Sequence, residues 1–171
     1  MRLLFIGDSL IEYFDWQERF PKDIVYNFGV SGETVEGLYA RIEVIFSQIE
    51  EPDLVFIMSG INNLAMGDRT FVTTYRKIVR VLKERYPSSR IFAQSLLPVL
   101  FPWISNDDVR DMNRQLKKMA EEEDVSCLDI HSLFLDERGK PVKEYLLDDG
   151  VHVSEQGYRV WSREVEKHLK K

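Results

Sequence analysis

The sequence predicts an α/β protein of three layers, α/β/α, in which helices cover both faces of a five-stranded parallel sheet. Two observations lead to this fold class. Short apolar segments of strand length alternate along the chain with longer segments that have the periodicity of amphipathic helices. The short segments are continuously apolar rather than alternating, which is typical of parallel strands that are buried on both faces.

Five segments are predicted to be strands because they are short and rich in β-branched and aromatic side chains. They are residues 3–6, 24–28, 54–58, 91–96 and 125–130. Right-handed crossover connections favour the spatial order 2-1-3-4-5 for five such strands. Ligands of these sheets bind beyond the carboxyl ends of the strands, near the point where the strand order reverses. Functional residues are therefore expected directly after the strands.

Four helices are predicted from apolar side chains spaced three or four residues apart. The apolar positions are Val35, Leu38, Ile42, Ile45 and Ile49 in the first helix, Phe71, Tyr75, Ile78, Leu82 and Tyr86 in the second, Val109, Met112, Leu116 and Met119 in the third, and Tyr158, Trp161, Val165 and Leu169 in the fourth. Thr34 and Ser154 are the expected N-caps of the first and fourth helices. The third is expected to begin through Asn106 or Asp107, and Pro87 is expected to end the second.

The composition is that of an ordinary globular protein, and the length of 171 residues favours a single domain over residues 1–171. A net charge of −6, without a basic stripe, argues against nucleic-acid binding. The one cysteine, Cys127, excludes an internal disulfide. No group of histidine, cysteine and acidic residues has the spacing of metal ligands, so neither a metal nor a cofactor is expected.

Stable membrane insertion is not expected, because no apolar run approaches the length of a membrane-spanning helix. The apolar segment at residues 3–6 is also too short for the core of a signal peptide. The sequence therefore predicts a cytoplasmic protein, unless a targeting segment upstream of it is missing.

A serine, a histidine and an aspartate follow predicted strands in the pattern of a nucleophilic site. Ser9 comes directly after the first strand, and Asp149 and His152 come after the fifth. A serine hydroxyl attacks well only when a base removes its proton, and a histidine is suited to that role at neutral pH. Asp149, three residues before His152, is placed to orient the imidazole and to stabilise its protonated form.

Donors for a negatively charged intermediate are also expected at the strand ends. The backbone N–H groups of Ser9 and Gly32 and the side-chain amide of Asn62 are the candidates for an oxyanion hole. Taken singly, each of these short motifs is more typical of a turn than of catalysis. Their occurrence in order at four predicted strand ends favours a catalytic site.

As a set, these motifs resemble the SGNH (GDSL-type) hydrolases. The four sequence blocks of that family correspond, in chain order, to residues 7–10 (Gly-Asp-Ser-Leu), to Gly32, to residues 60–63 (Gly-Ile-Asn-Asn) and to residues 149–152 (Asp-Gly-Val-His). One position departs from the family pattern, since Asn63 stands where an aspartate is usual and where the side chain supports the loop rather than attacking substrate.

The resemblance implies a flavodoxin-like sheet and cofactor-free hydrolysis of a carboxylic ester, with Ser9, His152 and Asp149 as the catalytic residues. The spacing of the blocks is most similar to that of small lysophospholipases and acetylhydrolases. The expected partner is thus a small-molecule ester, and a carbohydrate O-deacetylase or a thioesterase remains an alternative use of the same site.

Apolar residues after the third and fourth strands are candidates for contact with the substrate: Ile61, Leu64, Phe101 and Trp103. The same residues are equally suited to anchoring their loops on the core or to forming a contact in a homodimer. A rival function from another class is a non-catalytic, flavodoxin-like module that binds a phosphorylated ligand or a partner protein. Asp8 argues against a phosphate there because its charge would repel one.

Overall fold

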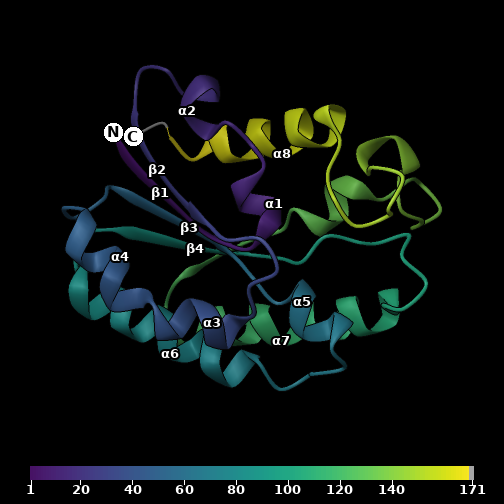
Figure 1. The fold of residues 1–171 in the computed structure, drawn as a ribbon, viewed down its shortest axis with the longest axis horizontal. Helices are drawn as coiled ribbons and strands as arrows, with labels where there is room; N and C mark the ends of the chain where they lie inside the picture. Colours follow the sequence, from purple (N-terminus) through teal and green to yellow (C-terminus); the bar gives the residue numbers. More distant parts are fainter. Residues whose placement is uncertain (170–171) are drawn as a thin grey trace.

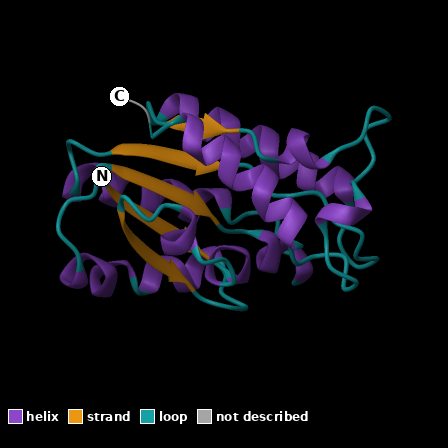
Figure 2. Cartoon of the chain, turned by 90° about the horizontal axis from the view of Figure 1, so that it is seen from above, coloured by secondary structure: helices purple, strands orange, loops and turns teal. Residues whose placement is uncertain are grey.

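The computed structural model describes residues 1–169, and in it five parallel strands form one sheet between two layers of helices (Figure 1). The strands are β1 (Arg2–Gly7), β2 (Ile24–Gly29), β3 (Leu54–Met58), β4 (Arg90–Gln94) and β5 (Ser126–Leu128). Their order is β2-β1-β3-β4-β5, and all neighbours pair in parallel, so that their arrows point the same way in Figure 2. The predicted fold class and strand order are confirmed, and the order reverses at β1.

The helices divide between the two faces of the sheet (Figure 1). One face carries α1 (Ser9–Glu12), α2 (Trp16–Arg19) and α8 (Glu155–Lys167), and the other carries α3 (Val35–Ala40), α4 (Ile42–Gln48), α6 (Val72–Arg85) and α7 (Asn106–Glu122). The short helix α5 (Ile61–Ala65) follows β3, and two 3₁₀ segments, η1 (His131–Phe134) and η2 (Lys143–Tyr145), lie between β5 and α8 in the chain. Among residues 1–169, no helix is long and apolar enough to span a bilayer.

The centre of the core is a row of aromatic rings across three strands. Phe5, Phe56 and Phe92 occupy matching register positions on β1, β3 and β4, and adjacent ring centroids lie 5.0 Å apart. Trp16 of α2 stacks on Phe5 with centroids 4.1 Å apart. Aromatic pairs in such geometry contribute about 0.5–1.5 kcal/mol each beyond the burial of their area. The row fixes the register of the central strands and hence the relative positions of the segments that follow them.

The two edge strands differ from the expectation of strands buried on both faces. β2 is half-exposed along its length, and β5 has only three residues. The predicted strands at 91–96 and 125–130 are too long, because the ladder between β4 and β5 ends at Gln94 and Leu128. Beyond it, the hydroxyl of Ser95 accepts hydrogen bonds from the amides of Ile130 and His131, which turn into η1.

The first predicted helix is wrong in its length, since it is interrupted at Arg41 and forms α3 and α4. The backbone of Arg41 leaves the helical region at φ −104° and ψ 7°. Its guanidinium is drawn to the Glu33 carboxylate and to the carbonyl oxygen of Phe28. A tertiary contact, invisible in the periodicity, thus divides the helix.

The predicted N-caps and the predicted stop at Pro87 agree with the structure except at α7, and Leu169 of the fourth stripe lies beyond the end of α8. Thr34 and Ser154 cap α3 and α8 through their side chains, and α6 ends two residues before Pro87. The N-cap of α7 is Ser105 rather than Asn106 or Asp107. Asn106 is not free to cap, because its side-chain amide bonds with both the N–H and the carbonyl of Val99.

Candidate active site

Ser9 lies in a sharp turn between β1 and the helix α1. β1 ends at Gly7, Asp8 caps α1 by accepting a hydrogen bond from the Leu10 amide, and Ser9 is the first residue of that helix. Gly7 has φ +155°, and a Cβ there would lie 1.9 Å from the carbonyl oxygen of Met58 on β3. Only glycine therefore lets β1 pair with β3 up to the residue that precedes this turn.

Ser9, His152 and Asp149 are joined by hydrogen bonds although 143 residues separate the serine from the histidine. The Oγ of Ser9 and the Nε2 of His152 lie 3.0 Å apart. The Nδ1 of His152 and Oδ2 of Asp149 lie 2.6 Å apart. These contacts match the arrangement of a nucleophile, a base and a residue that orients the base.

The Asp149 carboxylate is held by its own turn. Although partial burial opposes ionisation, hydrogen bonds from the His152 ring and from the amides of Val151 and His152 hold the pKa of Asp149 below its ordinary value. The Leu100 amide donates to the carbonyl of Gly150, which ties the turn to the segment after β4. The Asp149 side chain is 48% exposed, whereas Ser9 is 5% exposed, so the triad runs from solvent into the protein.

A tyrosine that sequence reasoning missed lies against the histidine. The rings of Tyr13 and His152 have centroids 5.2 Å apart, and the Tyr13 hydroxyl lies 2.8 Å from the Ser31 hydroxyl. Tyr13 follows Ser9 by four residues, about one turn of helix, and this spacing was the signal available in the sequence. Tyr13 therefore links His152 to the loop that carries Gly32.

The segments that carry the three candidate oxyanion donors are tied together by hydrogen bonds. The Val30 amide donates to the carbonyl of Gly7, and the Asn62 side chain donates to the carbonyl of Glu33 over 2.9 Å. Gly32, between these two contacts, has φ +75° and open space where a Cβ would stand. Within residues 1–169, the backbone N–H groups of Ser9 and Gly32 have no hydrogen-bond partner. Both amides are thus free to receive a negatively charged oxygen.

Asp8, beside the serine, is a completely buried carboxyl group. Burial raises its pKa to about 7, against the opposing effects of the Leu10 amide and of the nearby His152. Its Oδ1 is bonded to the Leu10 amide, whereas its Oδ2 is buried with no hydrogen-bond partner among the described residues. Asp8 is therefore a group near the site whose charge changes close to neutral pH.

The candidate substrate-contacting residues differ widely in exposure. Ile61 and Leu64 are 3% and 5% exposed and belong to the hydrophobic core, and Phe101 packs partly against that core. Trp103 is 79% exposed. Six large apolar residues in the segments that follow β1 to β4 or that precede Asp149 are exposed, namely Tyr13, Val30, Met66, Leu100, Trp103 and Leu147. We call these six residues the apolar rim.

A cavity of about 480 Å³ lies beside the Asp149 turn and is lined by Leu100, Lys143, Glu144, Leu146, Leu147, Asp148 and Gly150. Its volume falls in the range of small-molecule sites. Two of its lining residues, Leu100 and Leu147, belong to the apolar rim. In the part of the chain that the structure describes, no three histidine, cysteine or acidic side chains are grouped to hold a metal ion.

The sequence and the fold are similar to those of known hydrolases. The family model of the GDSL-like lipase/acylhydrolase family matches residues 5–160. The human platelet-activating factor acetylhydrolase IB subunit alpha1 is 26% identical over 165 residues, which cover 91% of this chain and 70% of the relative.

Two solved structures extend the comparison. One, a protein from Streptococcus pneumonia provisionally described as a platelet activating factor, is 25% identical, has a TM-score of 0.88, and is matched over 98% of this chain and 83% of its own. The other, a mutant of an acetyl-xylooligosaccharide esterase from Geobacillus, has the same fold at 23% identity, with a TM-score of 0.79 and 99% and 94% coverage. The chain belongs to the GDSL-like lipase/acylhydrolase family, and it is a carboxylic ester hydrolase.

Proposed function

We propose that this chain hydrolyses its ester through a covalent acyl-enzyme formed on Ser9. The observation that carries the proposal is the continuous pair of contacts from Asp149 to His152 and from His152 to Ser9, at 2.6 and 3.0 Å. His152 is the general base and then the general acid, and Asp149 orients its ring.

The reaction proceeds in two halves. The Ser9 Oγ attacks the acyl carbon while its proton passes to Nε2 of His152, and the carbonyl oxygen becomes an oxyanion that accepts hydrogen bonds from the Ser9 and Gly32 amides and from Asn62. The intermediate collapses, and His152 gives its proton to the departing alcohol. Water, activated by the same histidine, then attacks the acyl-enzyme, and the acid leaves as Ser9 recovers its proton.

We propose as substrate a short acyl ester of an apolar, lysophospholipid-like alcohol. The apolar rim supports this class, because its members are exposed in the segments that follow the strands or precede Asp149, and exposed apolar groups near a site favour an apolar ligand. The human relative, a platelet-activating factor acetylhydrolase subunit by name, supports a short acyl group. A sugar O-acetyl ester or a thioester is the alternative.

The test compares wild type with Ser9→Ala on p-nitrophenyl acetate, butyrate and octanoate. Turnover that depends on Ser9 and falls with acyl length supports a short acyl pocket, and a preference for octanoate contradicts it. Acetyl esters of a long-chain alcohol, of a xylooligosaccharide and of a thiol then compare the leaving groups.

A fluorophosphonate probe separates an enzyme from a binding module. An activated serine reacts with the probe, so we expect labelling of wild type at Ser9 and none in Ser9→Ala. Absence of labelling in the folded wild type, together with no turnover of any ester, would refute the acyl-enzyme mechanism and favour the non-catalytic module.

A further inference from the structure

Asn63, the residue that departs from the usual family pattern, makes three hydrogen bonds through its side chain. It is 2% exposed and lies on α5 next to Asn62. Its Oδ1 accepts a hydrogen bond of 3.0 Å from the amide of Val35. Its Nδ2 donates to Oε2 of Glu36 at 2.7 Å and to Oδ2 of Asp68 at 2.8 Å. Both N–H groups of this amide are therefore bonded to carboxylates.

These partners fit an amide and do not fit an aspartate. An ionised carboxylate only accepts hydrogen bonds, so an aspartate at position 63 would face Glu36 and Asp68 without a proton between them. Like charges at such distances raise pKa values or force the groups apart. The hydrogen bond from Asn63 is also the main reason why the pKa of Asp68 lies below its ordinary value. Asn63, Glu36 and Asp68 thus form one hydrogen-bonded unit.

The unit joins the two segments that carry the candidate oxyanion donors Gly32 and Asn62. Val35 begins α3, three residues after Gly32, and the neighbouring Asn62 bonds to the carbonyl of Glu33. The adjacent amides at 62 and 63 therefore hold the segment 33–35 at two points. Asp68 holds the segment that follows α5. Its amide donates to the carbonyl of Asn63, and its Oδ1 accepts hydrogen bonds from the amide and hydroxyl of Thr70.

We propose that Asn63, held between the Glu36 and Asp68 carboxylates, is a positioning residue that fixes Gly32 and Asn62 relative to Ser9 during ester hydrolysis. The proposal rests on the acyl-enzyme function proposed above. In the family, a single aspartate at this position is expected to support the loop. In this chain, the Asn63 amide and the carboxylates of Glu36 and Asp68 would support it together.

The decisive variant is Asn63→Asp, which is nearly isosteric, replaces the amide donors by acceptors and adds a negative charge. We expect kcat at pH 8 to fall about 10-fold or more, part of the roughly 10²–10³-fold cost of losing an oxyanion donor. KM should change little, because the lost interaction belongs to the transition state. The ratio of the variant's kcat to that of wild type should recover as the pH falls from 8 to 5, since a proton shared among the carboxylates restores a hydrogen bond.

A second substitution that restores a lost hydrogen bond separates a positioning role of Asn63 from general damage to the fold. Asn63→Asp combined with Glu36→Gln supplies a new amide donor to the aspartate, so the double variant should regain part of the lost kcat at pH 8. The matched control is Asn113→Asp, which makes the same change in an amide that bonds to the amide and carbonyl of Leu96. It should lower the Tm and leave the pH dependence of kcat unchanged.

A second measurement does not depend on catalysis. The raised pKa of the clustered carboxylates in Asn63→Asp makes the variant lose stability relative to wild type as the pH rises from about 4 to 8. The proposal is overturned if Asn63→Asp keeps the kcat and pH profile of wild type, or if Glu36→Gln relieves nothing. Failure of the acyl-enzyme mechanism looks different, because the wild type itself then neither reacts with the fluorophosphonate nor turns over ester.

Discussion

At the scale of single residues, the triad is unevenly exposed to solvent. Ser9 is nearly buried, whereas the Asp149 side chain is 48% exposed. Solvent screens an exposed pair of charges, so on the proposed mechanism water supplies part of the stabilisation that the Asp149 carboxylate would give to a protonated His152. Asp149→Asn is therefore expected to reduce kcat/KM about 10-fold less than Ser9→Ala or His152→Ala does. Steady-state kinetics on one ester compares the three variants, and equal losses would show that Asp149 is as critical as the other two.

Asp8 predicts a dependence of stability on pH. Burial raises its pKa from 3.8 to about 7, so the folded state holds a proton that the unfolded chain releases, and stability falls as the pH rises from about 4 to 7. Asp8→Asn keeps the acceptor for the Leu10 amide and removes this ionisation. The variant should therefore gain stability over wild type across that interval, on the order of 4 kcal/mol by pH 7. Thermal unfolding of both proteins from pH 4 to 8 tests this, and parallel curves would contradict it.

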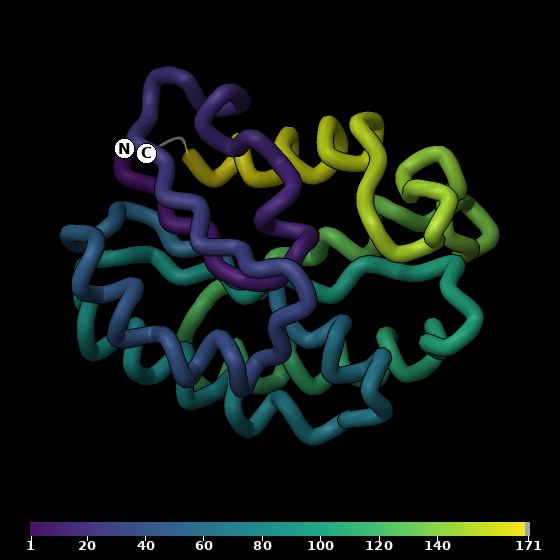
Figure 3. Tube along the Cα trace, viewed as in Figure 1, coloured from purple at the N-terminus to yellow at the C-terminus, as the bar shows by residue number. Residues whose placement is uncertain are grey.

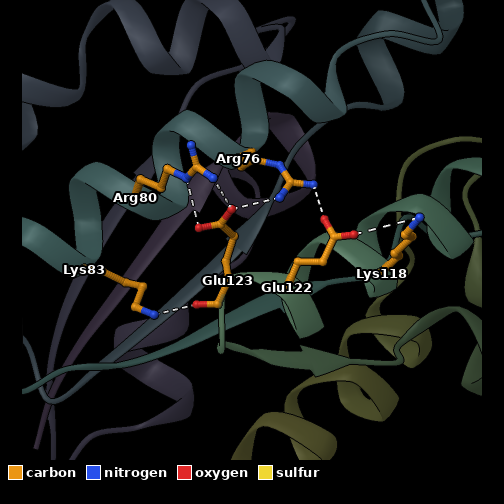
Figure 4. A network of polar contacts seen from close by, with 6 residues as sticks. All are labelled: Arg76, Arg80, Lys83, Lys118, Glu122 and Glu123. Carbon is orange, nitrogen blue, oxygen red and sulfur yellow. Dashed lines mark hydrogen bonds and ion pairs between the residues drawn. The ribbon is translucent and has the colours of Figure 1, made fainter.

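At the scale of secondary-structure elements, α6 and the end of α7 are joined by a network of charges (Figure 4). Arg76 and Arg80 on α6 bind Glu122 and Glu123, and Lys83 donates to the carbonyl of Glu123. Acidic residues at a helix C-terminus oppose its dipole. Here the cationic side chains of α6 offset the unfavourable interaction of these acidic residues with the dipole of α7. The sequence of α7 alone does not reveal this compensation.

The network predicts an acid-labile contact. Hydrogen bonds from Arg80 and, to a lesser extent, from Arg76 lower the pKa of Glu123 from 4.5 to about 2. Desolvation opposes them, but its effect is smaller than that of Arg80. The stabilising effect of Glu123 is present above pH 4.5 and is lost as the pH falls to about 2. Glu123→Gln should lower the Tm by about 2–4 °C at pH 7 and by nothing near pH 2. The control Glu121→Gln, on the same helix, should change the Tm less, and a similar change in both variants would argue against the network.

The junction of β1 with β3 predicts a severe effect of one methyl group. In Gly7→Ala the new Cβ meets the Met58 carbonyl oxygen at 1.9 Å, so the strands must separate or the chain must fail to fold. The matched control is Gly139→Ala, whose φ of +73° is also positive but whose Cβ meets nothing within 4 Å. It should cost only about 1–2 kcal/mol of backbone strain. Urea unfolding compares the two, and similar losses would mean that the contact with Met58 is easily relieved.

At the scale of the whole molecule, the sequence was sufficient for whatever depends on local pattern. Apolar runs and helical stripes predict the five strands, the crossover rule adds their order, and the N-caps Thr34 and Ser154 are predictable because each is a local contact. The split at Arg41 and the cap at Ser105 were not predictable, since Arg41 and Asn106 respond to segments distant in the fold.

The candidate site, too, was predictable only where local sequence and the fold rule determine it. The rule that ligands bind at strand ends, with the short Asp-x-x-His spacing, predicts that Ser9, Asp149 and His152 share one edge of the sheet. The burial of Ile61 and the partnership of Asn63 with Glu36 depend on how loops pack, and no periodicity encodes that.

Helix α8 runs from the His152 turn back along the sheet toward the side where Met1 lies (Figure 3). On the way its Tyr158 hydroxyl donates to the carbonyl of Leu10, and its Glu166 pairs with Arg19. On the proposed mechanism, Ser9 is synthesised first and lacks its base until residue 152 has been made and has docked. The same mechanism predicts that the serine is not activated before then, so recovery of fluorophosphonate labelling during refolding would report the docking of the segment that carries His152 and α8.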